Sequence, residues 1–301
     1  MDSNPTLDQL QIFLAVVDGG SFSAAARRLG RAQSVVSYGI ANLEAQLGLT
    51  LFDREGTRQP RLTAAGQAMV PDARRMAAAL QLLRARAHGL RGGLEAEVRL
   101  AVDVLLPAAV MTAVLKGFRD TYPTVGLQLH TGALGAVQEL LQTHRADLGI
   151  ASAPTAIEDT LAIRQLGGAT MIPVAAPEHP LAGSAAPVPA SLVRAHFQVV
   201  ITDQTAHTKG RDIRVAADAV WRVTDAETKR ALLCAGLGWG GLPDWMVAPD
   251  LAAGRLVVLS LEPYPPSPYR LSALWPAATP PGPAVSWLID RFEAELATVA
   301  T

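Results

Sequence analysis

The stretch that decides the fold is residues 20–44, GSFSAAARRLGRAQSVVSYGIANLE, which contains two short helical patterns separated by three residues. Ser21 is a favourable helix N-cap and Gly30 a favourable helix terminator, so a first helix is predicted over Phe22–Leu29. A second helix is predicted over Gln33–Leu47. Two short helices joined by a tight turn predict a helix-turn-helix.

The two predicted helices differ in the side chains that they present. Three consecutive alanines, Ala24–Ala26, allow the first helix to approach a neighbour closely. The second helix has an apolar stripe, and its opposite face presents Ser34, Ser37, Tyr38 and Ala41, with no acid and no large aliphatic residue. Small, hydrogen-bonding side chains reach base edges in the major groove of DNA, whereas a solvated face usually carries Glu and Lys. The pattern therefore favours DNA binding over an ordinary three-helix bundle with a solvated face.

Segments on either side of this motif extend it into a larger N-terminal module. Periodic apolar residues predict a helix over Thr6–Asp18 before it. After it, residues 51–62, LFDREGTRQPRL, predict two short strands joined as a hairpin wing. Arginines of such a wing would lie along DNA phosphates, and the alternative is a plain surface hairpin. The wing arginines are Arg54, Arg58 and Arg61.

A long helix is predicted next, capped by Thr63 and running to about Leu90. Apolar residues on one side of it form a seam long enough to pair with a second copy of the chain. The seam consists of Met69, Ala73, Met76, Ala77, Leu80, Leu83 and Ala87. Gly92 and Gly93 then break the helix, and we interpret them as a hinge.

From Val98 onward, strand patterns alternate with helix patterns, which predicts an α/β domain with a mostly parallel sheet. Two such groups appear, and the last strand and helix return the chain to the first group. Ligands of such sheets lie beyond the carboxyl ends of the strands, at the interface between lobes. The predicted strands are VRLAV, GLQLHT, ADLGIAS, FQVVITD, GWGGLP, RLVVLSL and YRLSALW, and the predicted helices are 107–120, 137–144, 225–234 and 285–299.

Composition indicates a globular protein in which half of the 301 residues are hydrophobic and 18% are charged. The single cysteine, Cys234, excludes an intrachain disulfide framework, and the six histidines form no i, i+4 pair, which argues against a zinc site. The N-terminus is not typical of a signal peptide, and no long apolar run predicts a membrane span. We therefore expect a cytoplasmic protein with no membrane partner, no metal and no cofactor.

Charge is unevenly distributed between the two halves. Residues 1–91 contain 11 arginines and 7 acidic residues, whereas residues 92–301 contain 15 basic and 20 acidic residues. A basic N-terminal module ahead of an acidic body indicates that the N-terminal module meets a polyanion.

The sequence from LQIFLAVVDGGSFSAAARRLG to TLFDREGTRQPRLTAAG resembles, over its whole length, the DNA-binding domain of the LysR-type transcriptional regulators. The segments FRDTYPTVGLQLH, ADLGI, APEHPLA and AGLGWGGLP resemble recurring pieces of their effector-binding domain. The resemblance implies an N-terminal all-α winged helix-turn-helix and a long linker helix that leads to a two-lobed effector domain resembling periplasmic binding proteins. We expect these parts at 1–62, 63–91 and 92–301, with lobe I at about 97–165 and 268–301 and lobe II at about 166–267.

The resemblance also implies partners. The expected partners are double-stranded DNA carrying an interrupted palindrome, a small-molecule effector, and further copies of the chain in a homodimer or homotetramer, with RNA polymerase as an additional candidate.

The family's recognition helix often carries proline where Ser34 stands and arginine or glutamine where Tyr38 stands. Gly39 inside this helix costs about 1 kcal/mol relative to alanine. The expected DNA contacts are Arg31, Gln33, Ser34, Ser37, Tyr38, Arg54, Arg58 and Arg61.

The effector site implied by the resemblance lies between the lobes. Its expected residues are Asp103, Val104, Thr131, Gly132, Ala133, Ser152, Thr202, Asp203 and Thr228. Relatives commonly carry a small hydroxyl residue where Asp103 stands, and a carboxylate there predicts an effector that donates a hydrogen bond, such as a phenol, alcohol or amine. In the alternative, a protein cation neutralises Asp103 and an acidic effector is accommodated. The candidate cations are Lys209, Arg211 and Arg230.

The sequence offers weaker support for two other classes of function, an enzyme and a small-molecule receptor. Residues 236–241, GLGWGG, match a dinucleotide-binding pattern, but they follow a helix instead of a strand, and we expect no catalytic residue and no enzyme. Cys234 lies on the apolar side of its helix, which favours packing over nucleophilic catalysis. A small-molecule receptor without a DNA role would account for the two lobes but leaves residues 1–91 unexplained.

Overall fold

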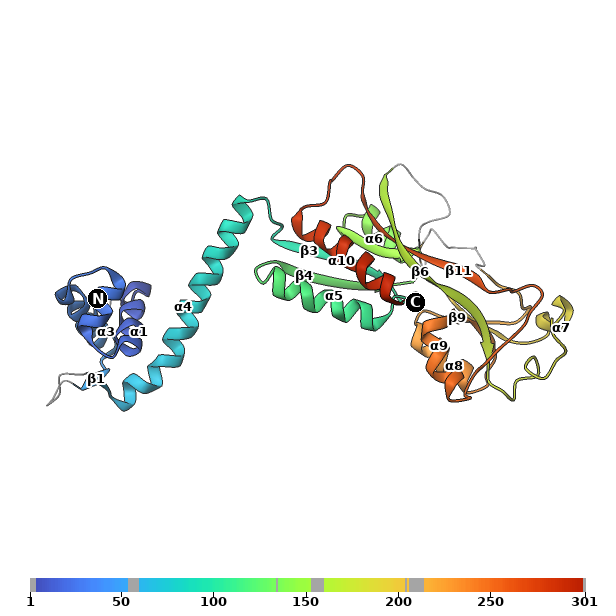
Figure 1. Cartoon of the computed structure of the whole chain (residues 1–301), viewed down its shortest axis with the longest axis horizontal. Helices are drawn as coiled ribbons and strands as arrows, with labels where there is room; N and C mark the ends of the chain where they lie inside the picture. The colour runs from blue at the N-terminus through green and yellow to red at the C-terminus, as the bar shows by residue number, and fades with distance from the viewer. Residues whose placement is uncertain are drawn as a thin grey trace. The chain divides into compact units, whose positions relative to one another are not determined.

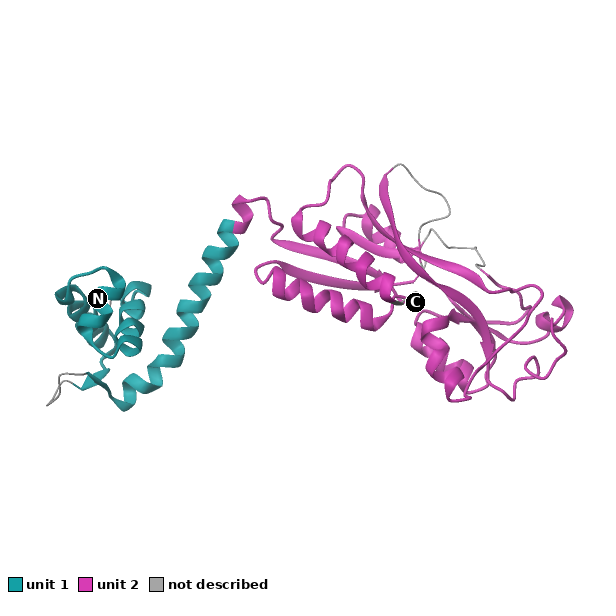
Figure 2. Ribbon diagram, viewed as in Figure 1, with its two compact units in different colours: residues 1–88 teal, residues 89–301 magenta. Residues whose placement is uncertain are grey.

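The computed structural model of the chain describes residues 4–53, 60–133, 135–152, 160–203, 205 and 214–299. The chain divides into two compact units, residues 1–88 and residues 89–301 (Figure 2). Within the described residues, no helix is long and apolar enough to cross a membrane.

Unit 1 consists of three short helices, a two-stranded hairpin and most of a long helix (Figure 1). Ser21 caps the second helix by accepting a 3.1 Å hydrogen bond from the backbone N–H of Ala24, and Gly30 ends that helix in a left-handed conformation, as predicted. The elements are α1 (Leu7–Gly19), α2 (Phe22–Leu29), α3 (Gln33–Leu47), β1 (Phe52–Asp53), β2 (Arg61–Leu62) and α4 (Ala64–Arg91).

The core of unit 1 joins the wing to the helix bundle. The ring of Phe52 in β1 makes edge-to-face contacts with Phe13 and Phe22, with ring centroids 5.6 and 5.7 Å apart. Glu44 of α3 accepts hydrogen bonds from the backbone N–H groups of Leu51 and Phe52, which fixes the chain where it leaves the bundle. The predicted strands of the wing pair antiparallel, with Phe52 opposite Leu62.

Gly39 allows α3 to approach α1. A Cβ atom added at Gly39 would lie 2.7 Å from Cδ1 of Ile12, whose side chain is buried. The missing side chain in the middle of α3 therefore allows close packing against α1. The helix-propensity cost of this glycine is offset by the close contact between the two helices.

The start of α4 is fixed to the wing. Thr63 accepts a 3.0 Å hydrogen bond from the N–H of Gly66, and its own hydroxyl donates to the carbonyl of Thr50 at 2.6 Å. Met69, Ala73 and Ala77 pack against the core of unit 1, with Ala73 almost fully buried. Ala73 is therefore covered by its own helix bundle, whereas Met69 and Ala77 pack against the bundle and remain partly exposed.

Large apolar side chains farther along α4 are exposed. Met76 and Leu83, which belong to the predicted seam, are 48 and 63% exposed, and Leu90, which the prediction did not include, is 49% exposed. Together with Leu80 and Ala87 they recur at alternating intervals of four and three residues, which is the spacing of a coiled-coil seam.

Unit 2 contains a nine-stranded sheet with helices packed on it (Figure 1). The strands are in the order β4-β3-β5-β11-β6-β9-β7-β8, with β10 pairing with β6. The elements are β3 (Glu97–Asp103), α5 (Ala108–Thr121), β4 (Gly126–Gly132), α6 (Ala136–Gln142), β5 (Leu148–Ser152), β6 (Leu161–Ala175), α7 (Ala190–Arg194), β7 (Gln198–Ile201), β8 (Val220–Val223), α8 (Ala226–Cys234), β9 (Trp239–Pro243), α9 (Asp244–Ala252), β10 (Val257–Val258), β11 (Ser267–Pro276) and α10 (Pro283–Val299).

The sheet is mixed, and the prediction of a mostly parallel sheet was wrong. The pairs β3–β4, β3–β5, β7–β8 and β7–β9 are parallel, as crossover helices require. The centre is antiparallel because β6 and β11 pair along their length and join the two parallel groups. β6 extends through the boundary that the sequence placed near residue 165 (Figure 1).

Separate hydrophobic cores lie on the two groups of strands, which we call lobe I (β3–β5 with α5, α6 and α10) and lobe II (β7–β9 with α7–α9). The core of lobe I includes Phe118 and Phe292, and that of lobe II includes Leu233 and Leu242. Leu105, which directly follows β3 of lobe I, belongs to the core of lobe II. The end of β3 therefore contacts the second lobe.

Candidate DNA interface and effector site

The predicted recognition face of α3 is exposed. Gln33 and Ser34 are exposed, Ser37 is half-buried, and Tyr38 is 69% exposed. The N-cap residue, Ala32, makes no side-chain hydrogen bond to the first turn, so the leading N–H groups of α3 have no side-chain cap. Free N–H groups at a helix N-terminus and small polar side chains form a surface suited to phosphates and base edges.

Val35 changes the expected chemistry of this face. Its side chain is 47% exposed on the first turn of α3, although the sequence indicated a face without large aliphatic residues. The neighbouring position, Val36, is fully buried, so only one of the two adjacent valines is in the core. An exposed apolar side chain beside polar ones can contact the methyl group of thymine.

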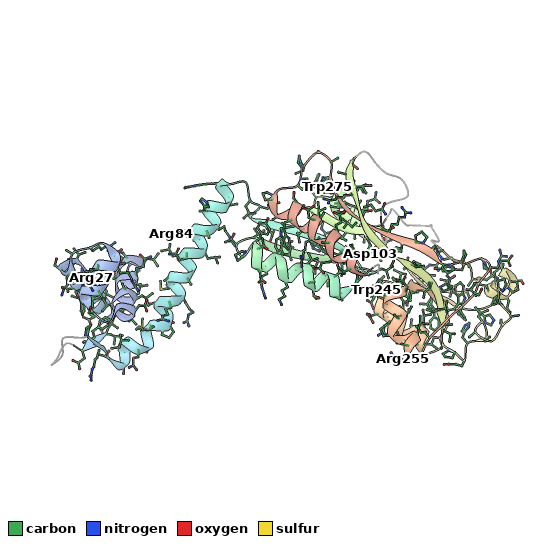
Figure 3. All side chains as sticks on the ribbon, in the orientation of Figure 1. Arg27, Arg84, Asp103, Trp245, Arg255 and Trp275 are labelled. Carbon is green, nitrogen blue, oxygen red and sulfur yellow. The ribbon has the colours of Figure 1, made fainter. Side chains whose placement is uncertain are left out.

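The arginines of unit 1 differ in how available their guanidinium groups are for contact with DNA. The guanidinium of Arg31 forms a two-pronged ion pair with Asp8 at 2.7 and 2.8 Å, which raises the pKa of Arg31 and lowers the pKa of Asp8. Arg61 is exposed on β2, and Arg54 and Arg58 lie outside the described residues. Figure 3 shows that Arg27 belongs to α2 and Arg84 to α4, and both are exposed.

The expected effector residues of lobe I converge at the carboxyl ends of adjacent parallel strands. Asp103, the last residue of β3, is in register with Gly132, the last residue of β4. The N–H of Val104 donates a 3.1 Å hydrogen bond to the carbonyl of Gly132, so the two strand ends are held together. Thr131 is exposed, Ala133 is buried, and Ser152 ends the neighbouring strand β5 half-buried.

Asp103 is buried and hydrogen-bonded within the protein (Figure 3). Its Oδ1 accepts a 2.8 Å hydrogen bond from the N–H of Leu105, and its Oδ2 accepts a 2.7 Å hydrogen bond from the hydroxyl of Tyr269. Burial raises the pKa of Asp103 to about 6, and the two hydrogen bonds oppose this rise. Both carboxylate oxygens already have a donor from the chain itself.

None of the predicted cations is found beside Asp103 among the described residues. Arg230 pairs instead with Asp250 at 2.7 Å and with Glu227 at 2.9 Å, and Asp250 also pairs with Arg255, which is labelled in Figure 3. Lys209 and Arg211 lie outside the described residues. The described partner of Asp103 is therefore a neutral phenol, which neither of the two sequence-based alternatives included.

The expected effector residues of lobe II gather at the end of β7 and the start of α8. The N–H of Thr202 donates to the carbonyl of Val223 at 2.8 Å, and the carboxylate of Asp203 accepts hydrogen bonds from the N–H and hydroxyl of Thr205. Thr228 is exposed in the first turn of α8, and its N–H donates to the capping carboxylate of Asp225 at 2.6 Å.

Comparison with known proteins decides the family. Residues 7–67 match the family model for the bacterial regulatory helix-turn-helix proteins of the lysR family. Residues 91–297 match the model for the LysR substrate-binding domain. The chain belongs to the LysR family of transcriptional regulators. It has the helix-turn-helix DNA-binding domain and the effector-binding domain of that family.

Individual relatives support the assignment over nearly the whole chain. The chain is 30% identical to the HTH-type transcriptional regulator PunR of Escherichia coli K12, over 93% of this chain and 90% of that protein. It is 31% identical to the probable HTH-type transcriptional regulator YhaJ of the same strain, over 85% of this chain and 86% of that protein. The structure of a C206 mutant of OxyR from Corynebacterium glutamicum matches with a TM-score of 0.56 and 21% identity, covering 99% of this chain and 96% of that one.

The sequence analysis of this LysR-family regulator did not identify two polar residues, Tyr269 and Lys229. Tyr269 lies on β11, far along the chain from Asp103, and no local pattern joins them. Lys229 is 96% buried, since its relative exposure is 4%. A signal for Lys229 was present, because Ala226, Lys229 and Leu233 are spaced for one face of a helix, and the other two are apolar.

The GLGWGG segment has the geometry expected for a helix-to-strand connection. Gly236 has a positive φ of 73° directly after α8, and Trp239 begins β9. A dinucleotide site requires the reverse order, from strand to helix. Burial raises the pKa of the Cys234 thiol, which disfavours the reactive thiolate.

Proposed function

We propose that this LysR-family regulator binds an interrupted palindrome in double-stranded DNA through α3, and that a small molecule bound between its lobes controls this activity. The observation that carries the proposal is the exposed face of α3 with an uncapped N-terminus. Its polar side chains suit base edges, and its free N–H groups suit a phosphate.

The proposed base-reading residues are Gln33, Ser34, Ser37 and Tyr38, and the exposed Val35 adds an apolar contact. Arg31 is proposed to contact a DNA phosphate. For this contact, its guanidinium would have to break its ion pair with Asp8 or bind Asp8 and the phosphate at the same time. The wing arginines, Arg54, Arg58 and Arg61, are proposed to follow the backbone of the adjacent groove.

Two copies of the chain are proposed to pair through the uncovered stripe of α4, which consists of Met76, Leu80, Leu83, Ala87 and Leu90. A monomer with large apolar side chains half-exposed along a helix would leave them in water, and pairing would bury them. The dimer, or a tetramer of two dimers, presents two copies of α3 to two half-sites. The functional parts are proposed at 1–62, 63–91 and 92–301.

The effector is proposed to bind where the strand ends of the two lobes meet. Lobe I contributes the region of Asp103, Val104, Thr131, Gly132, Ala133 and Ser152, and lobe II contributes Thr202, Asp203 and Thr228. The position of Leu105 in the core of lobe II supports this location, because ligand binding beside it would act on both lobes.

The regulator is proposed to act in the cytoplasm as a binding protein and not as an enzyme, with RNA polymerase as an additional candidate partner. A small-molecule receptor without a DNA role is the competing function. Selection of bound sequences from a random DNA pool by the full-length chain separates the two. A recovered palindrome with two half-sites supports the regulator, and recovery of no preferred sequence would support the receptor.

A further inference from the structure

The turn that follows β3 is shared between the cores of the two lobes. Leu105 belongs to the core of lobe II, and Val104 packs against the same core. Leu106, the next residue along the chain, belongs to the core of lobe I. A change in the backbone of residues 104–106 therefore displaces apolar side chains in both lobes at once.

Asp103 fixes the conformation of this turn. Its Oδ1 accepts a 2.8 Å hydrogen bond from the N–H of Leu105, and its backbone carbonyl accepts a 2.9 Å hydrogen bond from the N–H of Leu106. The N–H of Val104 donates to the carbonyl of Gly132 at 3.1 Å. Each backbone N–H of the turn therefore has an acceptor at the end of β3 or β4, and one of these acceptors is the side chain of Asp103.

Tyr269 reaches Asp103 from a strand that is not adjacent to β3. β5 lies between β3 and β11 in the sheet, and its last residue, Ser152, pairs with Leu271 of β11. Tyr269 lies two residues before Leu271, so its side chain spans the end of β5, and its hydroxyl donates a 2.7 Å hydrogen bond to Oδ2 of Asp103. The tyrosine packs against the cores of both lobes. The hydrogen bond therefore lies at the junction of the lobes.

Asp103 is 3% exposed, and its carboxyl group has no counter-ion among the described residues. Burial raises its pKa to about 6, and the hydrogen bonds from Tyr269 and Leu105 oppose this rise. No other described side chain contributes to this pKa, so the proton of Asp103 depends on whether the surrounding turn is closed to water. The charged or titratable side chains on the elements around it are Arg99 in β3, His130 in β4, Asp244 in α9 and Arg270 in β11.

The two protonation states of Asp103 affect the junction differently. The carboxylic acid places no charge among the apolar side chains, and it still accepts the N–H of Leu105. The carboxylate places a negative charge there without a counter-ion, and such a buried charge is costly. Opening of the turn gives the carboxylate access to water and removes this cost. Acid pH therefore favours the closed turn, and loss of the proton favours its opening.

We propose that Asp103 and Tyr269 form a latch between the two lobes, which is closed while the buried carboxylic acid holds its proton and opens when the proton is lost. The consequence for the effector rests on the proposed function of the chain, because the latch lies at the strand ends where the effector is proposed to bind. Neither residue has to touch the effector. Both are positioning residues, and their state sets how firmly the lobes are held together beside that site.

Hydrogen–deuterium exchange of the full-length chain, followed by mass spectrometry at pH 5.0 and 7.5, tests the latch. Labelling times are scaled to the intrinsic exchange rate at each pH. A pKa of about 6 in the closed turn and 3.8 in the open turn predicts about a tenfold loss of protection between these pH values. The loss should appear in peptides of residues 103–106. It should also appear in peptides of α9, since Met246 and Val247 share a core with Leu105, and peptides of unit 1 serve as the internal reference.

Three variants separate the latch from an ordinary structural contact. Asp103→Asn keeps the size of the side chain and cannot ionise, so its protection should be the same at both pH values. Tyr269→Phe removes a hydrogen bond that favours the carboxylate. It should lower the protection of the turn and move the pH-dependent loss to higher pH. Asp120→Asn, which changes an exposed carboxylate at the end of α5, should retain the pH dependence of the wild type.

Several outcomes would overturn the latch: wild-type protection that is equal at pH 5.0 and 7.5, an unchanged pH dependence in Asp103→Asn, or a loss that is confined to residues 103–106 and absent from α9. Specific DNA binding is measured on the same preparations. If the latch fails while specific DNA binding persists, the proposed function stands without this regulation. If the latch behaves as expected and the wild type binds no specific DNA, the latch stands and the proposed function is wrong.

Discussion

The hydroxyl of Tyr269 on β11 donates a 2.7 Å hydrogen bond to Oδ2 of Asp103 at the end of β3. Burial and the neighbouring carboxylate hold the pKa of Tyr269 well above its usual value, so the phenol remains a neutral donor. The bond therefore joins the end of β3 in lobe I to β11, which together with β6 forms the antiparallel centre of the sheet between the two lobes.

Asp103 is expected to make the stability of unit 2 depend on pH. Its folded-state pKa, about 6, lies above the ordinary value of 3.8, so the folded protein keeps a proton that the unfolded chain has lost. The free energy of unfolding should therefore fall as the pH rises from about 4 to 6, by up to roughly 3 kcal/mol. Asp103→Asn removes this dependence and should be more stable than the wild type at pH 7.5, with a smaller difference at pH 4.5.

Urea unfolding followed by tryptophan fluorescence measures this effect in the full-length chain, because all five tryptophans lie in unit 2. Tyr269→Phe is the companion variant. It removes a hydrogen bond that lowers the pKa of Asp103, so it should extend the fall in stability above pH 6. A difference between Asp103→Asn and the wild type that is the same at every pH would contradict the assigned titration.

Gln33→Ala should reduce sequence-specific DNA binding by about 1–3 kcal/mol and leave non-specific binding nearly unchanged, because a lost base contact affects only the matching sequence. Arg61→Ala, in the exposed position on β2, should weaken both kinds of binding and reduce the salt dependence by about one ion. Titrations with operator and unrelated DNA at several salt concentrations measure both effects. An equal loss on every sequence for Gln33→Ala would exclude a base-reading role.

Leu83→Glu should convert the dimer to a monomer at micromolar concentration, since it places a charge in the centre of the uncovered stripe of α4. Leu82→Glu is the matched control, because Leu82 is 47% exposed on the same helix but lies off the stripe. Sedimentation equilibrium reports the mass of each variant. Dissociation of both variants to the same degree, or of neither, would show that the stripe does not hold the dimer.

Gly66→Ala should destabilise unit 1 by roughly 1–3 kcal/mol, because the added Cβ would overlap the backbone carbonyl of Leu51. A backbone atom cannot move aside as a flexible side chain does. Gly89→Ala makes the same change in the same helix, where the nearest atom is the end of the Leu94 side chain at 3.0 Å. Thermal unfolding by circular dichroism compares the two, and equal midpoints would contradict the close contact at Gly66.

Local sequence determined the helices of unit 1. The bounds of α2 and α3 agree with those predicted, because Ser21, Gly30 and Gly48 act on the backbone within a few residues of themselves. The exposed polar positions of α3 follow from the helical period once the apolar stripe is known. Gln33, Ser34 and Tyr38 could therefore be placed on one surface from the sequence alone.

Tertiary structure decided what depends on distant partners. The 15-residue strand β6 includes the polar and glycine-containing segment RQLGG and is held by β11, which follows about a hundred residues later, so no local pattern predicted it. Asp103 acquired Tyr269 from the same strand β11, and Arg31 acquired Asp8 from α1. Lys229 is buried because β9 has glycine where the side chain passes. Propensity and periodicity act over one or two turns of chain, whereas burial and charge pairing are set by whichever segments the fold brings together.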